Sequence, residues 1–497
     1  MSSAFESLKQ RMARMNALGA AVAMMDWDQQ TYMPPGGAEA RAHQTGSLMG
    51  LRHEIFTADE TGTLVDKAAK EVAPDSDDAA MLRVFKRDFD LATKIPTALV
   101  EEKTRLASVA HEDWVHARKE NNFAGFAPTL EKMFDIARQE AEYLGYKDEI
   151  YDALLDQYEE GATAADCRQM FDTLKANTVE LVRDIQTKGI AVDDHHFYGE
   201  WDIAKERHLC ETVTKDVGYD FERGRIDVAP HPFCTGWSIG DVRLTIRYQK
   251  HVLSSLFSAL HEAGHGMYEQ GSPMEWDRTP LAGGVSLGIH ESQSRLWENI
   301  VGRSKPFWKH YLPLVHSHFP TLGAIRLDEF YRNVNKVNPS FIRVDADEVT
   351  YNLHVLVRFE IECEILEGKL AVKDMPAAWN AKYKEYLGVD VPNDTVGCLQ
   401  DVHWSMGSIG YFPTYSMGNL LSYQIWRALQ RDIPNTDELI EKAEFGPILH
   451  WLQEKVYRQG RKYSPKDLVM RVTGKPMQAD DYVEGINAKY REIYHLH

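Results

Sequence analysis

Cysteine is scarce in this chain and follows no disulfide or metal-binding pattern. The 497 residues contain five cysteines, which are scattered and include no Cys-x-x-Cys pair. A disulfide framework or a Cys-ligated zinc site would require clustered cysteines at regular spacings. Reduced thiols of this kind are typical of a cytoplasmic protein, and we expect that location.

The chain also lacks an excess of positive charge and has no long apolar runs. The chain has 56 Lys and Arg residues against 75 Asp and Glu residues, which gives a formal net charge of −19. Nucleic-acid binding needs a positive surface, so we expect no nucleic-acid partner. No apolar run is long enough to span a bilayer, so we expect no membrane partner. The apolar stretch 17–25 faintly resembles a signal peptide, but cleavage after Ala23 would leave an apolar run shorter than a usual signal core.

Linkers, repeats and low-complexity tracts are absent as well. Length alone would suggest about three domains, but no shift in composition separates them. Hydrophobic residues make up 43% of the chain, which is enough for a sizeable core. We therefore expect residues 1–497 to form one domain built from helical subdomains.

Helical patterns dominate what is present. Alternating apolar residues predict a strand at 242–248, and the segment 233–240, with two turn glycines, is its predicted hairpin partner. We therefore predict a mainly α fold with a small antiparallel β-sheet, whose edge can bind an extended peptide. Apolar spacings of three and four predict helices at 78–93, 127–144, 163–188, 347–366, 376–387 and 437–456.

The segment His261-Glu262-Ala263-Gly264-His265 predicts two metal ligands and a general base. Apolar residues precede it at helical spacing, and Gly271 marks the predicted helix end. Two imidazoles four residues apart lie on one helix face and can close on one zinc ion. Glu262 lies about 100° further round the helix, where it is no ligand but can reach a zinc-bound water. An amphipathic helix that carries two histidines by chance is the alternative.

A catalytic zinc ion usually takes a third protein ligand. One large class of zinc peptidases has a third His six residues after the second, with a Gly three residues before it. Those positions hold Gly271 and Tyr268 here, so that class is excluded. Glu291 is the better candidate, because it follows Gly283-Gly284 and opens a second helical pattern. A solvated helix glutamate is the alternative.

Six segments in fixed order surround these residues and are informative as a set. They are His231-Pro232-Phe233, Asp241-Val242-Arg243-Leu244-Thr245, the His-Glu-x-x-His segment, His290-Glu291-Ser292-Gln293-Ser294, Ile342-Arg343-Val344-Asp345-Ala346-Asp347 and Gly397-Cys398-Leu399-Gln400-Asp401-Val402-His403-Trp404. Together they resemble the carboxypeptidase Taq family, which are metal-dependent carboxypeptidases of the gluzincin type. Met33-Pro34-Pro35-Gly36-Gly37-Ala38 and Arg41-Ala42 resemble its N-terminal region, so the resemblance covers nearly the whole chain.

The resemblance implies an architecture and an assembly. The fold would be a large, two-sided helical body with a deep active-site groove and the metal at its floor. The whole chain would be one catalytic domain, and the protein would be a homodimer.

Hydrolysis of a peptide bond also needs a donor, besides the metal, to the tetrahedral intermediate. The segment from His403 to Tyr415 resembles the transition-state His and Tyr pair of related gluzincins such as angiotensin-converting enzyme. His403 and Tyr411 are the first candidates, with Tyr415 in reserve. For either tyrosine the alternative is a buried ring whose hydroxyl has another partner.

A carboxypeptidase must also bind the free carboxylate of its substrate, for which a bidentate arginine is suited. Arg343 is the first choice, because the resemblance places its segment near the end of the substrate. Arg243 is the second choice, with a structural ion pair as the alternative. Asp241, Asp347 and Asp401 are expected to orient other groups, and one of them to hold a zinc-binding histidine.

The predicted function is that of a zinc-dependent carboxypeptidase acting on peptides with a free C-terminal carboxylate. The same nitrogen and oxygen ligands also accept Co²⁺ or Mn²⁺. One alternative is a zinc endo-oligopeptidase without carboxylate capture. A second is an inactive peptide-binding protein, although the predicted ligands and base are all present.

Glu262→Gln is expected to abolish most turnover while metal binding stays near normal. General acid–base catalysis contributes typically 10²–10⁴-fold, and the amide cannot accept the proton. The measurement is kcat together with metal content. A variant that keeps its turnover with metal bound would rule out the predicted role.

Overall fold

Amphipathic helices make up most of the structure, a computed structural model that describes residues 3–496. Several helices begin at a side chain that accepts a backbone N–H three residues on, among them Ser3, Ser76 and Thr163. Such caps satisfy donors that the first helical turn leaves free. The prediction of a mainly α fold with a small sheet is confirmed.

The helices and strands follow one another along the chain within these bounds. The first nine helices are α1 Ala4–Thr31, α2 Ala38–Thr57, α3 Asp59–Ala68, α4 Asp77–Lys94, α5 Thr97–Glu120, α6 Phe123–Leu144, α7 Ile150–Leu155, α8 Ala164–Lys188 and α9 Ile203–Val217. The strands β1 Ile226–Val228, β2 Phe233–Ser238 and β3 Asp241–Ile246 come next. They are followed by α10 Ser254–Gln270, α11 Leu287–Arg295, α12 Lys305–His318, α13 Leu327–Val334, α14 Tyr351–Leu366, α15 Met375–Leu387, α16 Pro413–Asp432, α17 Thr436–Glu441, α18 Gly446–Lys455, α19 Pro465–Thr473 and α20 Asp480–Ile493.

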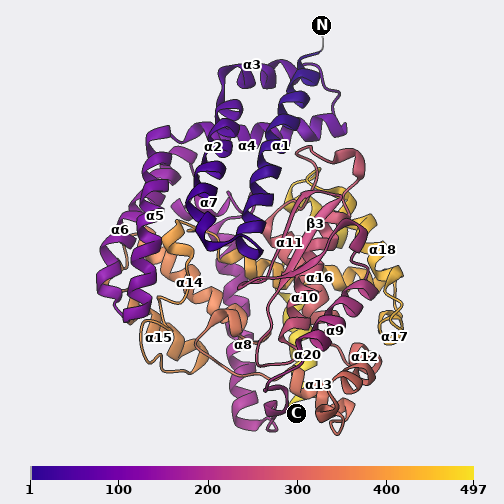
Figure 1. Ribbon diagram of the computed structural model, residues 1–497. Coiled ribbons are helices and arrows are strands. Elements are labelled where there is room, and N and C mark those ends of the chain that lie inside the picture. The colour runs from indigo at the N-terminus through magenta and orange to yellow at the C-terminus, as the bar shows by residue number, and fades with distance from the viewer. Residues whose placement is uncertain (1–2, 497) are drawn as a thin grey trace.

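The N-terminal helices form a layer of their own. In Figure 1, α1 to α4 lie at the top, and the lower ends of α1 and α2 reach down between α5 and α6 on one side and the sheet on the other. A small hydrophobic cluster joins residues of this layer to Trp276 and Leu281. A much larger cluster extends from Leu99 to Tyr494 and includes the buried faces of α10, α11 and α16. No helix among residues 3–496 is long and apolar enough to cross a bilayer.

The sheet is mixed, with strand order β1-β3-β2. The predicted hairpin is present, since β2 pairs antiparallel with β3 and Cys234 lies opposite Leu244. The prediction of a purely antiparallel sheet is wrong, because β1 pairs with β3 in parallel. This strand has only three residues, too few to produce the alternation by which strands are predicted.

One predicted helix, 437–456, is two helices. The chain breaks between α17 and α18, where Ala443 has a φ of 55° and Pro447 stands in the first turn of α18. Proline is tolerated there but lacks the N–H that a helix interior needs. The predicted helix 347–366 begins later, at Tyr351, because the Asp347 side chain accepts the N–H groups of Val349 and Thr350.

Two glycines allow α11 to pack closely between α10 and α16. A Cβ on Gly264 of α10 would lie 2.5 Å from the carbonyl oxygen of Gln293 in α11. A Cβ on Gly418 of α16 would lie 2.4 Å from Cγ of Glu291. No ordinary Cβ contact is that short, so these two positions set the distance between the three helices.

Gly264→Ala is expected to lower the free energy of unfolding by about 1–3 kcal/mol, as overpacking typically does. Gly46→Ala is the matched control, because Gly46 is an exposed position of α2 where an added Cβ meets nothing within 4 Å. That change should stabilise the protein by about 0.4–1 kcal/mol. Urea unfolding measures both, and equal effects would contradict the close approach.

Candidate metal centre

Three side chains from two helices bring their ligand atoms together. The Nε2 atoms of His261 and His265, on α10, lie 3.6 and 3.5 Å from Oε2 of Glu291, on α11. Ligand atoms bonded to a tetrahedral zinc ion at about 2.0–2.2 Å lie roughly 3.3–3.6 Å apart. These separations and the two-nitrogen, one-oxygen donor set therefore fit a single divalent ion.

The remaining ring nitrogens of both histidines have partners. Nδ1 of His261 lies 2.9 Å from Oε2 of Glu298. Nδ1 of His265 lies 2.7 Å from Nδ1 of His290, whose Nε2 lies 2.7 Å from Oε1 of Glu269. Partners of this kind keep the proton on Nδ1 and leave Nε2 free for a metal. Both imidazoles are therefore held in the orientation and tautomer that ligation requires.

A single, partly buried guanidinium links two of these carboxylates. Nε of Arg295 lies 2.7 Å from Oε1 of Glu291, and its Nη1 lies 3.1 Å from Oε2 of Glu298. Oε1 of Glu291 is thereby occupied, and Oε2 is the oxygen that faces the histidines. Burial alone would raise the pKa of Glu298, but Arg295 and His261 hold it at about 2. Glu298 thus stays ionised and acts as an acceptor.

The backbone is unusual where these residues meet. A π-helical segment, Leu296–Val301, follows α11 directly and carries Glu298. Single π-helical turns are rare and frequently occur at functional sites. The wider turn accompanies the approach of Glu298 to His261 on the neighbouring helix.

A second group of potential ligands differs in its surroundings. Asp193, His195 and His196 also have ligand atoms within 4.8 Å of one another, but all three are exposed. Nδ1 of His195 already lies 2.6 Å from a carboxylate oxygen of Asp193. The group of His261, His265 and Glu291 is the better candidate, because Glu291 is buried, the histidines are only partly exposed, and further side chains orient the ligands.

Glu262 lies next to this group with a free carboxylate. It is 5% exposed, and no side chain among residues 3–496 forms a hydrogen bond or ion pair with it. Burial raises its pKa to about 7. A buried carboxylate without a fixed partner can accept and release a proton, as the predicted general base must.

The predicted donors to the transition state lie together. Nε2 of His403 is 3.3 Å from the Tyr415 hydroxyl, and the Tyr411 ring lies 5.4 Å from the rings of both. Burial lowers the pKa of His403 to about 4, so the imidazole is neutral near pH 7. The Tyr351 ring connects this group to the metal centre, because it lies 6.2 Å from Tyr415 and 4.6 Å from the Arg295 guanidinium.

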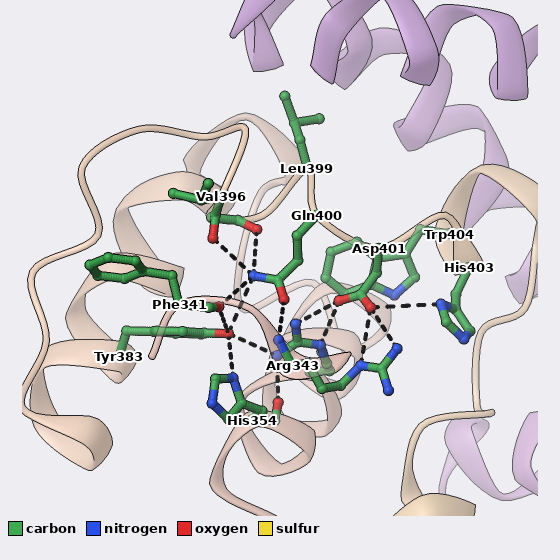
Figure 2. Close-up of polar contacts among 12 residues, drawn as sticks. Phe341, Arg343, His354, Tyr383, Val396, Leu399, Gln400, Asp401, His403 and Trp404 are labelled. Carbon is green, nitrogen blue, oxygen red and sulfur yellow. Dashed lines mark hydrogen bonds and ion pairs between the residues drawn. The ribbon is translucent and has the colours of Figure 1, made fainter. Parts of the chain in front are cut away.

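Arg343 is 4% exposed and shares Asp401 with a second arginine. Its Nε and Nη2 donate to Oδ1 of Asp401 at 3.1 and 2.9 Å, and its Nη1 donates to the Tyr351 hydroxyl at 2.9 Å. Nε and Nη2 of Arg358 donate to Oδ2 of Asp401 at 2.7 and 2.6 Å. Figure 2 shows the Asp401 carboxylate facing both Arg343 and His403.

This arginine pair has an excess of positive charge. Burial alone would raise the pKa of Asp401, but Arg358 and Arg343 hold it well below its usual range. Two guanidinium groups therefore face one carboxylate, while the adjacent His403 is neutral. An anionic group of a ligand would balance the remaining charge.

Gln400 ties the Arg343 segment to the His403 segment. Its Oε1 accepts the backbone N–H of Arg343 at 2.8 Å, and its Nε2 donates to the carbonyl oxygen of Phe341 at 2.9 Å. Figure 2 shows the Gln400 side chain reaching between these two segments of the backbone. Two segments that the sequence singled out separately are therefore parts of one structure.

Arg243 lies in a different environment. Its Nε and Nη2 pair with the Asp241 carboxylate at 2.8 and 2.9 Å. The guanidinium lies between the Trp27 and Trp237 rings, at 4.3 and 4.5 Å from their centroids. Its donors are directed at Asp241, and the structure does not bring it into the Arg343 group.

The prediction that Asp241, Asp347 or Asp401 holds a metal-binding histidine is wrong. Asp241 pairs with Arg243, and Asp401 pairs with two arginines. Asp347 accepts backbone N–H groups ahead of α14. The residues in that role, Glu298 and His290, were missed, together with Arg295. A helical-spacing signal was available, because Arg295 and Glu298 follow Glu291 by four and seven residues.

Comparison with known proteins gives concordant matches along the chain. Residues 7–490 match the carboxypeptidase Taq (M32) metallopeptidase family. The chain is 39% identical over 494 residues to thermostable carboxypeptidase 1 of Pyrococcus furiosus, a match that covers 98% of each sequence. It is 37% identical over 486 residues to carboxypeptidase 1 of Bacillus subtilis, covering 97% of each. The crystal structure of an M32 carboxypeptidase from Deinococcus radiodurans R1 is similar with a TM-score of 0.96 and 40% identity, covering 99% of this chain and 100% of that one.

Arg295→Lys is expected to weaken zinc binding about 10- to 100-fold, as loss of a residue that orients a metal ligand typically does. Lysine keeps the charge but lacks the separate Nε and Nη1 donors with which Arg295 contacts Glu291 and Glu298. Zinc affinity is measured by competition with a chelator. Arg303→Lys is the control, because Arg303 forms no ion pair with Glu291 and approaches Glu298 only at Oε1, at 3.7 Å. Equal affinities in the two variants would contradict the role of Arg295.

Proposed function

The chain belongs to the carboxypeptidase Taq (M32) metallopeptidase family and is a metallocarboxypeptidase, and on this premise we propose how its residues divide the reaction. The observation that carries the proposal is the convergence of His261, His265 and Glu291 beside the free carboxylate of Glu262. The endo-oligopeptidase alternative is not favoured, because the relatives that match nearly the whole chain are carboxypeptidases. An inactive protein is also not favoured, because its relatives are enzymes and the predicted ligands and base are present.

We propose that His261, His265 and Glu291 hold the metal and that it is zinc. The two imidazoles and one carboxylate support zinc, although Co²⁺ and Mn²⁺ accept the same donors. A divalent ion at this position supplies Lewis-acid activation of a water molecule and of the scissile carbonyl. Glu262 removes the proton from the attacking water and delivers it to the nitrogen of the leaving amino acid.

His403 and Tyr411, with Tyr415 in reserve, are proposed to donate to the oxygen that becomes negative in the transition state. Their support is their grouping and the neutral state of His403, which carries a single ring N–H. Nε2 of His403 lies 3.3 Å from the Tyr415 hydroxyl in the free enzyme, so a substrate oxygen has to replace that contact. Preorganised donors of this kind act only as charge develops.

Arg343 is proposed to anchor the free carboxylate of the peptide. The support is the excess positive charge that it shares with Arg358 across Asp401, together with its place near His403 and Tyr415. Its guanidinium lies 4.8 Å from the Tyr415 ring centroid. Arg243 is the second candidate, and its bidentate pairing with Asp241 favours a structural role.

Three wider properties belong to the same proposal. We propose a cytoplasmic location, which five free cysteines support, because such thiols persist in a reducing compartment. We propose a homodimer on the family resemblance. The whole chain is proposed to be one catalytic domain, since one hydrophobic cluster extends from Leu99 to Tyr494 and the smaller N-terminal cluster includes Trp276 and Leu281.

The test is to incubate the metal-loaded protein with one short peptide in two forms, the free acid and the C-terminal amide. Stepwise loss of terminal residues from the free acid alone, followed by mass spectrometry, is the expected result. Internal cleavage of both peptides would rule out recognition of the free carboxylate and support the endo-oligopeptidase alternative.

Arg343→Lys is expected to raise KM for the free acid roughly 10- to 100-fold, because a charged hydrogen bond contributes about 1.5–3 kcal/mol. The change in kcat should be small, since the carboxylate is bound equally in the ground and transition states. Arg243→Lys, the matched control, should leave KM within about twofold. A raised KM in Arg243→Lys with an unchanged KM in Arg343→Lys would instead make Arg243 the carboxylate anchor.

A further inference from the structure

A carboxylate with no ion-pair partner lies fully buried inside α14. Glu362 is 0% exposed, and no Lys, Arg or His among residues 3–496 forms an ion pair with it. Arg358, one turn earlier on the same helix, directs its guanidinium at Asp401 instead. Burial raises the pKa of Glu362 to about 7. An isolated buried acid is costly, so its presence calls for a specific role.

Three hydrogen-bond donors surround this carboxylate, and two of them come from one short segment. The Trp404 indole N–H donates to Oε1 at 2.7 Å, and the backbone N–H of Gly410 donates to Oε2 at 3.2 Å. The third donor is the Tyr151 hydroxyl on α7, at 2.7 Å from Oε2. Glu362 therefore binds the segment 404–410 near both of its ends.

The proposed transition-state donors stand directly outside this segment. His403 immediately precedes Trp404, and Tyr411 immediately follows Gly410. Figure 2 shows the side chains of His403 and Trp404 extending from neighbouring positions of the backbone. Any movement at the two bound positions is therefore passed on to the adjacent catalytic side chains.

The segment depends on outside contacts to keep its shape. Gly407 and Gly410 both have positive φ, 72° and 88°, and a short 3-10 turn, His403–Met406, is its only helical element. Gly410 lies tight against α7, because a Cβ there would be 2.8 Å from the carbonyl carbon of Leu154. Glu362 adds polar contacts to this packing, since no other side chain accepts from Trp404 Nε1 or from the Gly410 N–H among residues 3–496.

We propose that Glu362 is a positioning residue for the reaction, which holds Trp404 and Gly410 so that His403 and Tyr411 face the scissile bond together. The proposal rests on the proposed roles of His403 and Tyr411. An apolar residue at 362 would leave two buried N–H groups without an acceptor. The side chain does not touch the substrate, so its effect reaches the reaction through the geometry of the two donors.

The test compares four variants of the full-length, zinc-loaded protein on the free-acid peptide. Glu362→Leu removes all three contacts, and Glu362→Gln keeps the size of the side chain should the first variant fold poorly. Trp404→Phe removes one contact from the segment. Tyr151→Phe is the matched control, because it removes a hydrogen bond to the same carboxylate and leaves both contacts with the segment.

The expected result is a fall in kcat of about 10- to 100-fold for the Glu362 variants, the effect of a displaced catalytic group. Trp404→Phe should fall by less. KM and zinc affinity should stay within about twofold of wild type, and Tyr151→Phe should keep its kcat. Unchanged kcat in both Glu362→Gln and Trp404→Phe would overturn the proposal. A lower kcat together with a higher KM and weaker zinc binding, of the same size in Tyr151→Phe as in the Glu362 variants, would also overturn it. That result would indicate a general structural role.

Two further measurements separate this proposal from the one it rests on. Wild-type turnover of the free acid tests the carboxypeptidase activity itself. His403→Gln tests the donor role directly, so retained turnover in that variant would remove the role of His403 whatever Glu362 does.

Discussion

The ion pair between Arg295 and Glu291 is the interaction on which the candidate metal centre depends. Glu291, Glu298 and Glu262 lie close together in a buried region, where unpaired carboxylates would take up protons. Arg295 pairs with the first two, so both remain ionised: one faces the histidines and the other fixes the His261 ring. Glu262 is left outside this pairing, and its pKa is raised to about 7. Glu291 and Glu298, which pair with this guanidinium, thus stay ionised, whereas Glu262 does not pair with it and can exchange a proton.

Charge is distributed with opposite sign on the two sides of the site. Carboxylates outnumber arginines around the histidines, as suits a cation. Around Asp401, two arginines outnumber one carboxylate, as suits the end of a peptide. The Tyr351 ring lies between them, with the Arg295 guanidinium over its face and Arg343 bonded to its hydroxyl. A peptide whose scissile carbonyl meets the metal and whose carboxylate meets Arg343 would complement both sides.

The parts of the site that could be predicted from the sequence are those with a local signal. His261 and His265 share one helix turn, and helical periodicity places them correctly. Glu291 could be proposed only as a candidate, because its approach depends on Gly264 and Gly418, which lie on other helices. Arg358 was not predicted, because it interrupts an apolar helix and its partner Asp401 lies 43 residues further on. Periodicity contains no information on such long-range pairs.

The glycines that flank α11 have a consequence for how proteins of this kind are compared. A side chain at Gly264 or Gly418 would shift α11 and with it the Glu291 oxygen, although every ligand would still be present in the sequence. The ability to bind a metal therefore depends partly on the absence of a side chain at these two positions. A chain that retains the histidines and the glutamate but has larger residues at these two positions should be judged inactive until its ligand spacing is known.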